Sequence, residues 1–487
     1  MDQKKTPLYD AIKNFADQAP TNFYIPGHKS GQGIDPKWRE YVSDNIFKMD
    51  LSEVFGLDDF HCPKGVIKEA QELAADAWGA KRSHFLVNGT SGGIVAAICT
   101  SVSEGEKIAI PRNAHKSVTS AMIISGATPE YLLPEYDPRL GLVCGMKPET
   151  LEKAFAKAPD IKAVFSVSPS YHGICSDIKS LAKIAHDNGC ALIADEAHGN
   201  HMYFSDKLPE GALVQGADIS CQSTHKMSGS LTQSSMLHVN SDRVNLDTLG
   251  VNLNIVQTTS PSYILMASLD VARSYIATEG KRIFDELFDV CKDAREEISS
   301  IQGIEVLGDS LVGYKGISAY EPMRFVVSSN TLGIDGYGLR TLLREKYSIE
   351  AEYSDLSFAI CVLGIGTTKE DVNRLVFALK DISKEYANNA DASIIEIDDK
   401  FILPEIPKMH LTPREAWKSE KEKISWQNAV GKISAEMIVP YPPGIPIICP
   451  GEMITKDVWD YLENQRINGW HFHTADEGKL EFVNVIK

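Results

Sequence analysis

The sequence lacks paired cysteines, a secretion signal and any long apolar run. Its nine cysteines include no Cys-x-x-Cys pair and stand singly in apolar or mixed stretches, as buried thiols do in a reducing compartment. The first ten residues, MDQKKTPLYD, have no apolar core of the kind that directs secretion, and no uninterrupted apolar run is long enough to cross a bilayer. We therefore expect a cytoplasmic protein without a disulfide framework or a membrane span.

Basic charge is also scarce. Lysine and arginine number 49 against 66 aspartates and glutamates, which gives a formal net charge of -17. This balance disfavours nucleic acids and anionic membranes as partners and favours cationic ligands. Internal repeats and low-complexity tracts are missing, neither glycine-rich nucleotide motif is present, and we assign no residue to a metal. A chain of 487 residues that is 43% hydrophobic can nevertheless bury large cores, in roughly two to four domains.

Short apolar runs alternate with helical stretches between residues 65 and 240. Strands are predicted over 84–88, 107–111, 162–168, 190–195 and 217–221, and helices between them over 147–157 and 177–188. Buried runs rich in Val, Ile and Ala, separated by helices, are typical of a mainly parallel sheet covered on both faces. Right-handed crossovers then place the functional strand ends along one edge of the sheet. The predicted fold class is therefore α/β.

The rest of the chain divides around this α/β region. We predict an N-terminal arm with one short helix and an irregular Ile25–Gly33 loop, a long helix over 263–300, and a smaller α+β region. In that region Thr367-Thr368-Lys369-Glu370 offers a capping box for a helix over 369–386, after a strand over 358–363. A polar linker follows over 387–400. The expected domains are an arm (1–60), a large domain (61–290), a small α+β domain (291–390) and a C-terminal α+β domain (391–487).

The segment Asn88-Gly89-Thr90-Ser91-Gly92-Gly93 follows a predicted strand and opens an apolar helical run. Its glycines allow a tight turn, its hydroxyls can donate hydrogen bonds, and a helix N-terminus presents free amides and a positive dipole. These features suit a phosphate group. A plain turn from strand to helix with a hydroxyl cap explains the segment equally well.

A carboxylate is predicted at the end of a buried strand, where Asp195-Glu196-Ala197-His198 follows Cys190–Ala194. Ligands bind at this edge of a doubly wound sheet. A buried carboxylate costs desolvation energy unless it meets a cation, and a protonated pyridine nitrogen would be such a partner. Alternatively, Asp195 caps the next segment and His198 is a packing histidine.

Ser223-Thr224-His225-Lys226 follows the next predicted strand. A lysine among small and hydroxyl-bearing residues can have a lowered pKa, and the neutral amine forms an imine with an aldehyde. Most lysines are solvated surface charges. Here phosphate donors, a strand-end aspartate and a lysine follow one another and are predicted on one sheet edge, which favours the functional interpretation.

Four motifs carry a resemblance: Gly89-Thr90-Ser91-Gly92, Arg112-Asn113-Ala114-His115-Lys116-Ser117, Asp195-Glu196-Ala197-His198 and Ser223-Thr224-His225-Lys226. Together they resemble the fold-type I pyridoxal-phosphate enzymes, and more narrowly the bacterial ornithine/lysine/arginine decarboxylases. Further matching segments are Ile25–Lys29, Leu57–Asp59, Pro63–Gly65, Thr258–Pro261, Tyr441–Gly444 and Pro450–Glu452. The resemblance covers nearly the whole chain. It is to the short, biosynthetic-type members, because a long N-terminal receiver-like wing domain is missing.

The resemblance implies a fold-type I large domain with a seven-stranded type of sheet, and roles for single residues. Lys226 would bind the aldehyde of pyridoxal 5′-phosphate as a Schiff base, Asp195 would keep the pyridine nitrogen protonated, and His115 would stack on the pyridine face. The implied phosphate ligands are Gly89, Thr90, Ser91, Ser223 and His225, with Thr258 reaching in from the other subunit of a homodimer. His198 would lie near the ring or the substrate. Alternatively, His115 caps its helix and Thr258 only ends a turn.

The implied reaction is decarboxylation of arginine, lysine or ornithine to agmatine, cadaverine or putrescine, in polyamine biosynthesis. A cationic substrate needs an acidic counterpart, for which Glu452, Asp58 and Asp59 are the candidates, although each can equally be a solvated carboxylate. An aminotransferase or carbon-sulfur lyase is the alternative enzyme, and it would share Asp195 and Lys226. An aminotransferase normally also has an arginine that binds the substrate carboxylate. Arg112 and Arg324 are the candidates for that arginine. A catalytically silent regulatory homologue is the third reading, but it has no chemical need for Asp195 or Lys226.

Overall fold

A computed structural model describes residues 1–387, 404–441, 446–467, 471–474, 476 and 478–487. They form two compact units, which are described separately. The first unit contains Met1–Thr100, Ile193–Asp206 and Glu210–Asp285, and the second contains Ser101–Leu192, Lys207–Pro209 and Glu286–Lys487. Within the described ranges, no helix combines the length and the apolar content that a bilayer crossing needs. The four-domain division drawn from the sequence stays a prediction, and most of the predicted linker, residues 388–400, lies outside the described residues.

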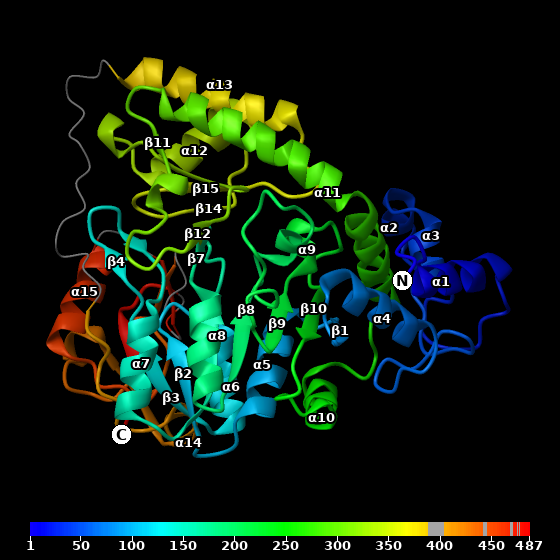
Figure 1. The fold of residues 1–487 in the computed structure, drawn as a ribbon, viewed down its shortest axis with the longest axis horizontal. Coiled ribbons are helices and arrows are strands. Elements are labelled where there is room, and N and C mark those ends of the chain that lie inside the picture. The colour runs from blue at the N-terminus through cyan, green and yellow to red at the C-terminus, as the bar shows by residue number, and fades with distance from the viewer. Residues whose placement is uncertain (388–403, 442–445, 468–470, 475, 477) are drawn as a thin grey trace. The chain divides into compact units, whose positions relative to one another are not determined.

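The central sheet has seven strands in the order β1-β10-β9-β8-β6-β2-β3 (Figure 1). In chain order the strands are β1 (Arg82–Leu86), β2 (Lys107–Pro111), β3 (Thr128–Leu132), β6 (Ile161–Val167), β8 (Ala191–Asp195), β9 (Ile219–Gln222) and β10 (Ser235–Val239). β2 runs parallel to both β3 and β6, and β8 runs parallel to β9. β10 runs antiparallel to both β9 and β1. The mainly parallel α/β sheet predicted from the sequence is therefore confirmed.

All five strands that the sequence predicts in this region are present within two residues at each end. Two further strands of the seven-stranded sheet, β3 and β10, were not predicted. β3 contains Pro129 and Glu130, which weaken the apolar signal of a buried strand. β10 has the sequence Ser-Met-Leu-His-Val and is buried along its whole length, because it is enclosed between β1 and β9. Its two polar residues hide that burial in the sequence.

The N-terminal arm contains three helices, where the sequence predicts one, and further helices of the first unit follow it. They are α1 (Pro7–Gln18), α2 (Pro36–Tyr41), α3 (Asp44–Met49), α4 (Val66–Trp78), α5 (Gly89–Ser101), the 3₁₀ turn η1 (Asn200–Tyr203), α9 (Thr224–Met227), α10 (Leu246–Val256) and the first part of α11 (Tyr263–Ser299). α2 and α3 are each six residues long and bury almost no apolar surface of their own, so their periodicity is too short to detect.

Besides the strands β2, β3 and β6, the second unit contains helices and two pairs of short strands. The elements are α6 (Lys116–Ser125), α7 (Pro148–Lys157), α8 (Ile178–Asp187), and the paired short strands β4 (Tyr136–Asp137) with β5 (Leu142–Val143) and β7 (Ile174–Cys175) with β12 (Ala319–Tyr320). The predicted helices over 147–157 and 177–188 are confirmed as α7 and α8. Asp177 caps α8 by accepting the backbone N–H of Ser180 at 3.0 Å.

A four-stranded antiparallel sheet in the second unit has the order β11-β13-β15-β14. Its elements are β11 (Glu305–Val306), the 3₁₀ turns η2 (Asp309–Leu311) and η3 (Asn330–Leu332), β13 (Arg324–Ser328), α12 (Gly336–Tyr347), β14 (Tyr353–Ser354), β15 (Ala359–Val362) and α13 (Lys369–Tyr386). Figure 1 shows α12 and α13 together on one face of this sheet. The capping box of α13 joins Thr368 to Asp371, one residue later than the Thr367–Glu370 pair that the sequence predicts.

The C-terminal part of the second unit has its own apolar core. Its elements are α14 (Pro413–Lys418), β16 (Lys421–Ser425), the 3₁₀ turn η5 (Trp426–Asn428), β17 (Val439–Tyr441), α15 (Lys456–Ile467), β18 (His471–His473) and β19 (Phe482–Ile486). β16 pairs with β19 and β17 with β18. Buried Trp426, Ile438 and Phe472 lie in this core. Of the motif Tyr441–Gly444, residues 442–444 lie outside the described residues.

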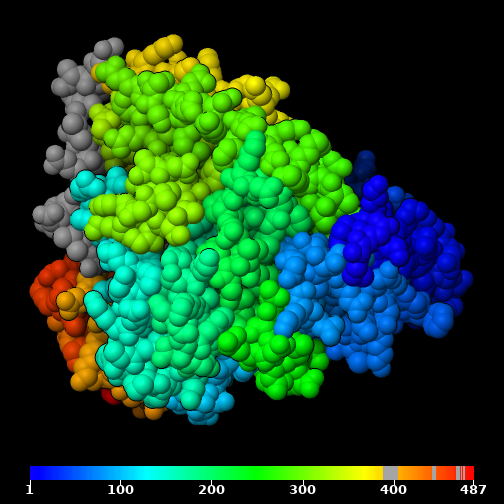
Figure 2. Space-filling model, in the orientation of Figure 1, coloured from blue at the N-terminus to red at the C-terminus, as the bar shows by residue number. Residues whose placement is uncertain are grey.

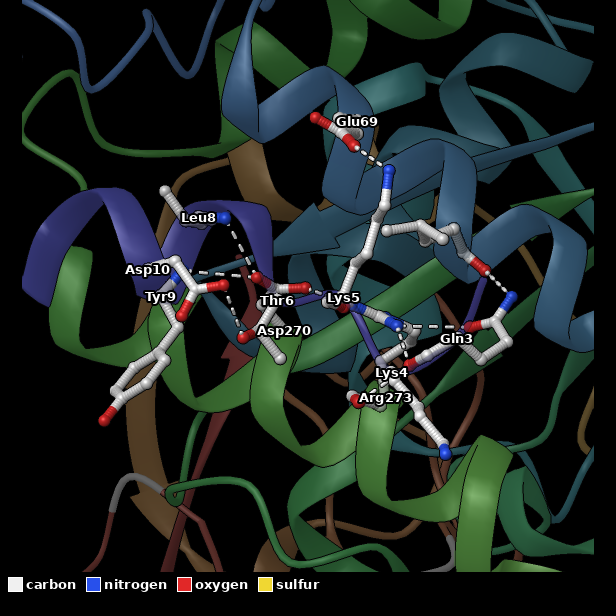
Figure 3. A network of polar contacts seen from close by, with 12 residues as sticks. Gln3, Lys4, Lys5, Thr6, Leu8, Tyr9, Asp10, Glu69, Asp270 and Arg273 are labelled. Carbon is white, nitrogen blue, oxygen red and sulfur yellow. Dashed lines mark hydrogen bonds and ion pairs between the residues drawn. The ribbon is translucent and has the colours of Figure 1, made fainter. Parts of the chain in front are cut away.

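The N-terminal arm is fastened to α11 by a buried ion pair (Figure 3). Asp270 and Arg273 are both fully buried, and their side chains lie 2.5 Å apart. Asp270 accepts the backbone N–H groups of Leu8 and Tyr9, and Arg273 donates to the backbone carbonyls of Gln3 and Lys5. The pair therefore satisfies amides in the first turn of α1, which would otherwise lack partners inside the protein.

We predict that Asp270→Ala lowers the free energy of unfolding by about 3–5 kcal/mol, because it leaves the guanidinium of Arg273 buried without its carboxylate. Urea unfolding measures this change. Asp17→Ala is the matched control, since Asp17 forms an exposed pair with Lys13 on α1 and should cost no more than about 0.5 kcal/mol. Equal losses in the two variants would contradict the anchoring role of Asp270.

Candidate active site

A cluster of hydroxyl groups lies at the start of α5, in the first unit. The oxygen Oγ1 of Thr90 lies 2.6 Å from Oγ of Ser223 and 2.6 Å from Oγ of Ser235. All three residues are buried, whereas Ser91 is exposed and Gly89 has a φ of 71°. The structure thus brings together two predicted phosphate ligands, Thr90 and Ser223. Ser235 was missed, because it belongs to the unpredicted strand β10.

Asp195 is the last residue of β8, as predicted, and only 5% of it is exposed. Its oxygen Oδ1 accepts the backbone N–H of Ala197 at 3.1 Å. Burial, followed by the charge of Asp195, raises the pKa of the Cys221 thiol on the neighbouring strand β9. The end of β8 therefore presents a buried anionic group. The bond from Ala197 is also the local contact expected if Asp195 caps the next segment.

Lys226 contacts His198, a residue to which the sequence gave no definite role. The lysine Nζ lies 2.9 Å from the histidine Nε2. His198 is buried, at the turn that follows β8, and Lys226 is half-buried on the single-turn helix α9. Two nitrogens at this distance share a hydrogen bond only if at least one of the two groups is uncharged. The contact therefore provides a path for one proton between Nζ and Nε2.

Glu196, next to Asp195, links the segments that carry the site. Its fully buried carboxylate accepts bonds from Ser220 and Gln222 of β9, from the hydroxyl of Tyr203, and from the backbone N–H of Ala212, at 2.6–2.8 Å. Burial raises its pKa to about 7, although these donors lower it. Glu196 thus fixes the end of β8 against the end of β9. Sequence analysis missed this role, and its only signal there is a second acid beside Asp195.

Three further predicted cofactor residues have local partners. In the second unit, His115 caps α6, since its Nδ1 accepts the backbone N–H of Ser117 at 3.2 Å. In the first unit, Nδ1 of His225 donates to the carbonyl of Ser234 at 2.7 Å, and burial lowers the pKa of His225. The hydroxyl of exposed Thr258 accepts the backbone N–H of Ser260. The capping and turn alternatives for His115 and Thr258 are therefore present, and their roles towards a cofactor stay predictions.

The three carboxylates suggested for substrate binding also have partners in the chain. Asp58 accepts backbone N–H groups at the start of α4, including those of Lys64 and Gly65, and Asp59 accepts two from the loop that follows it. Burial acts to raise the pKa of Asp58, but these backbone donors hold it below its usual value. Glu452 is fully buried and forms an ion pair at 2.6 Å with Arg112. None of the three substrate roles is tested by these contacts.

The two arginines considered for an aminotransferase reading are both paired with buried carboxylates in the second unit. Arg112 binds Glu452 through both terminal nitrogens and also donates to the carbonyl of Ile447. Arg324 lies 3.4 Å from Glu321, and both residues are fully buried. A clamp for a substrate carboxylate needs a guanidinium that is open to the ligand, so these pairings do not favour an aminotransferase.

Comparisons with known proteins identify the family of this chain. The sequence profile of the Orn/Lys/Arg decarboxylase major domain matches residues 6–371, and that of the C-terminal domain matches residues 398–472. An arginine decarboxylase of Bacillus subtilis is 40% identical over 487 residues, covering 100% of this chain and 99% of the relative. The arginine decarboxylase of Bacillus anthracis is 41% identical, with 100% and 98% covered.

A solved structure has the same fold. The lysine decarboxylase of Francisella novicida superposes with a TM-score of 0.85, covering 99% of this chain and 81% of that one, at 23% identity. Aminotransferases of the same structural class also match, with lower scores, such as an alanine-glyoxylate aminotransferase from Nostoc at 0.54. The two profiles together span most of the sequence, including every predicted site residue. This chain belongs to the Orn/Lys/Arg decarboxylase family.

Proposed function

We propose that this protein decarboxylates L-arginine to agmatine and carbon dioxide with pyridoxal 5′-phosphate as its cofactor. The observation that supports arginine is the identity of 40–41% to arginine decarboxylases over the whole chain. The lysine decarboxylase of Francisella novicida is 23% identical and speaks only for the fold. The proposal thus narrows the sequence-based expectation, which left lysine and ornithine open.

The residues of the first unit fit the cofactor. Its phosphate suits the hydroxyls of Thr90, Ser223 and Ser235, which share one cluster at the N-terminus of α5. Asp195 offers a buried carboxylate to the pyridine nitrogen, and Lys226 offers a primary amine to the aldehyde. When bound, pyridoxal phosphate supplies an acceptor for the electron pair that is left when the carboxylate departs as carbon dioxide.

The chain's own residues would then control charge and protons. The carboxylate of Asp195 would hold a proton on the pyridine nitrogen, which keeps the ring electron-poor. Nζ of Lys226 would return a proton to Cα of the substrate. His198 would replenish it through the 2.9 Å contact between Nε2 and Nζ. Glu196 supports this geometry by fastening the strand that carries Asp195 to the strand that leads to Lys226.

We further propose a homodimer in which the N-terminal arm is covered by a second copy. Large apolar side chains of the arm are exposed to solvent: Phe23, Ile25, Trp38, Tyr41, Ile46 and Phe55. Phe55 is 100% exposed and Phe23 is 92% exposed. Figure 2 shows the N-terminal segment, in dark blue, at the surface. A set of this kind marks a protein interface in a soluble protein. It would bring Thr258 of one subunit towards the cofactor of the other.

Lys226→Ala is predicted to abolish agmatine formation, because the variant has no amine that can reach the cofactor aldehyde. Borohydride should no longer fix the cofactor to the protein, and carbon dioxide release from L-arginine should fall to background. Lys183→Ala, which removes an exposed lysine of α8, serves as the control and should retain borohydride-dependent labelling. Retention of both turnover and labelling in Lys226→Ala would refute the assignment.

Asp195→Asn is predicted to lower kcat on the order of 100-fold or more while the cofactor still binds, because the amide cannot hold the pyridine proton as a carboxylate does. Initial rates and cofactor content, measured on the same preparation, separate the two effects. A variant with near-normal kcat would remove the electrostatic role of Asp195.

Release of agmatine from L-arginine but not of cadaverine from L-lysine tests the substrate itself.

A charge placed in the arm should break the proposed dimer. The double variant Phe23→Asp/Phe55→Asp is expected to sediment as a monomer, because each aspartate would bury an unpaired charge in the apolar interface. Phe377→Asp is the control, since Phe377 is 67% exposed on α13 and lies outside the arm. A monomeric parent protein, or a double variant that remains dimeric, would overturn this part of the proposal.

A further inference from the structure

A cavity in the first unit has no role in the proposed reaction. It has a volume of about 360 Å³, and α4, β1, α10 and the loop near Phe60 form its walls. Figure 1 shows α4 beside β1, and α10 follows β10 in the same unit. None of the residues that line it belongs to the hydroxyl cluster, and neither Asp195 nor Lys226 is among them. The cavity is therefore a separate site, which the decarboxylation leaves unexplained.

The walls of this cavity are basic, in a chain whose net charge is -17. Lys68, Lys81 and Arg82 line it, and the only carboxylate in the lining is that of Glu72. Three basic side chains and one carboxylate thus line the same cavity of an acidic protein. Such a local excess of positive charge favours an anionic ligand, because a concave wall concentrates the field.

The cations have no strong competing partners. Lys68 lies 3.7 Å from Glu72 and Lys81 lies 2.8 Å from Asp242, and the side chains of both pairs are about half-exposed or more. Exposed pairs of this kind contribute little stability, so a ligand can replace them at small cost. Arg82 forms no ion pair within the described part of the chain. Its guanidinium can bind two oxygens of a phosphate or a carboxylate.

The half-buried residue His84 of β1 also lines this wall. Among the described residues, Nε2 of His84 has no hydrogen bond although it is inaccessible to solvent. Burial, followed by the charge of Arg82, lowers the pKa of His84 to about 4. The ring is therefore neutral near pH 7, so Arg82 and the two lysines carry the positive charge of the cavity.

We propose that this cavity binds a small molecule through a phosphate or carboxylate group, with Arg82 as its principal cation and Lys68 and Lys81 beside it. The other walls supply a fixed frame. His61 bonds to Asn254 and to the carbonyl of Thr258, both at 2.8 Å, and Gln71 accepts the backbone N–H of Phe85. Such ready-made contacts allow the site to receive a ligand without rebuilding its walls.

The test is calorimetric titration of inorganic pyrophosphate, and separately of citrate, into the full-length protein. The protein is first saturated with pyridoxal phosphate and dialysed, so that the hydroxyl cluster at Thr90 is filled and cannot take the probe. One probe molecule should bind per chain, and the affinity should fall as salt rises. Arg82→Gln is expected to weaken binding by about tenfold or more, since it removes a charged hydrogen-bond donor.

Two controls make the result specific. Arg374→Gln removes an exposed arginine of α13, outside the cavity, and should leave the affinity unchanged. Lys81→Gln is a second cavity variant and should also weaken binding. Binding of pyrophosphate alone would identify a phosphate ligand, and binding of both probes a site that recognises charge. The proposal is wrong if neither probe binds, or if the two cavity variants bind as tightly as the parent protein.

Discussion

The hydrogen bonds made by Glu196 are the interaction on which the candidate active site depends. A fully buried carboxylate accepts four of them, from two residues of β9, from Tyr203 and from the backbone of Ala212. Asp195 precedes Glu196 in the sequence. The strand β9, to which Glu196 is bonded, leads directly to Ser223 and Lys226. A carboxylate deprived of water is stable only when such donors replace the solvent, so the surrounding segments can take only one arrangement. The hydrogen bonds of Glu196 thereby position the carboxylate of Asp195 and the amine of Lys226.

Buried ion pairs recur at places where distant segments of each unit meet. In the first unit, Asp270 and Arg273 fasten the first residues of the chain to α11. In the second unit, Arg112 follows β2 and binds Glu452, which lies 340 residues later. Each pair gains little over an apolar contact of the same size but is costly to break, because the remaining charge would stay buried. The main effect of these pairs is therefore to determine which segments meet. Their net contribution to stability is smaller.

The charge of the chain is distributed in two opposite ways. Its overall excess of acid suits a protein that draws a cationic substrate from solution by long-range attraction. The cavity between α4, β1 and α10 reverses that sign locally, with Lys68, Lys81 and Arg82 against Glu72. A residue count cannot show this reversal, because the basic residues stand in an ordinary helix and at the start of an ordinary strand. A site for a cation and a site for an anion can thus coexist in one acidic unit.

The sequence by itself determined the class of fold, the strand end at Asp195, the segment after the next strand that carries Lys226, and the family. It could do so because buried parallel strands are continuous apolar runs and because the motifs are local, each within a few consecutive residues. The tertiary structure alone decided which distant groups meet: Thr90 with Ser235, Lys226 with His198, and Glu452 with Arg112. It also revealed β10 and the role of Glu196. Such pairings depend on strand order and side-chain direction, which no local pattern of residues encodes.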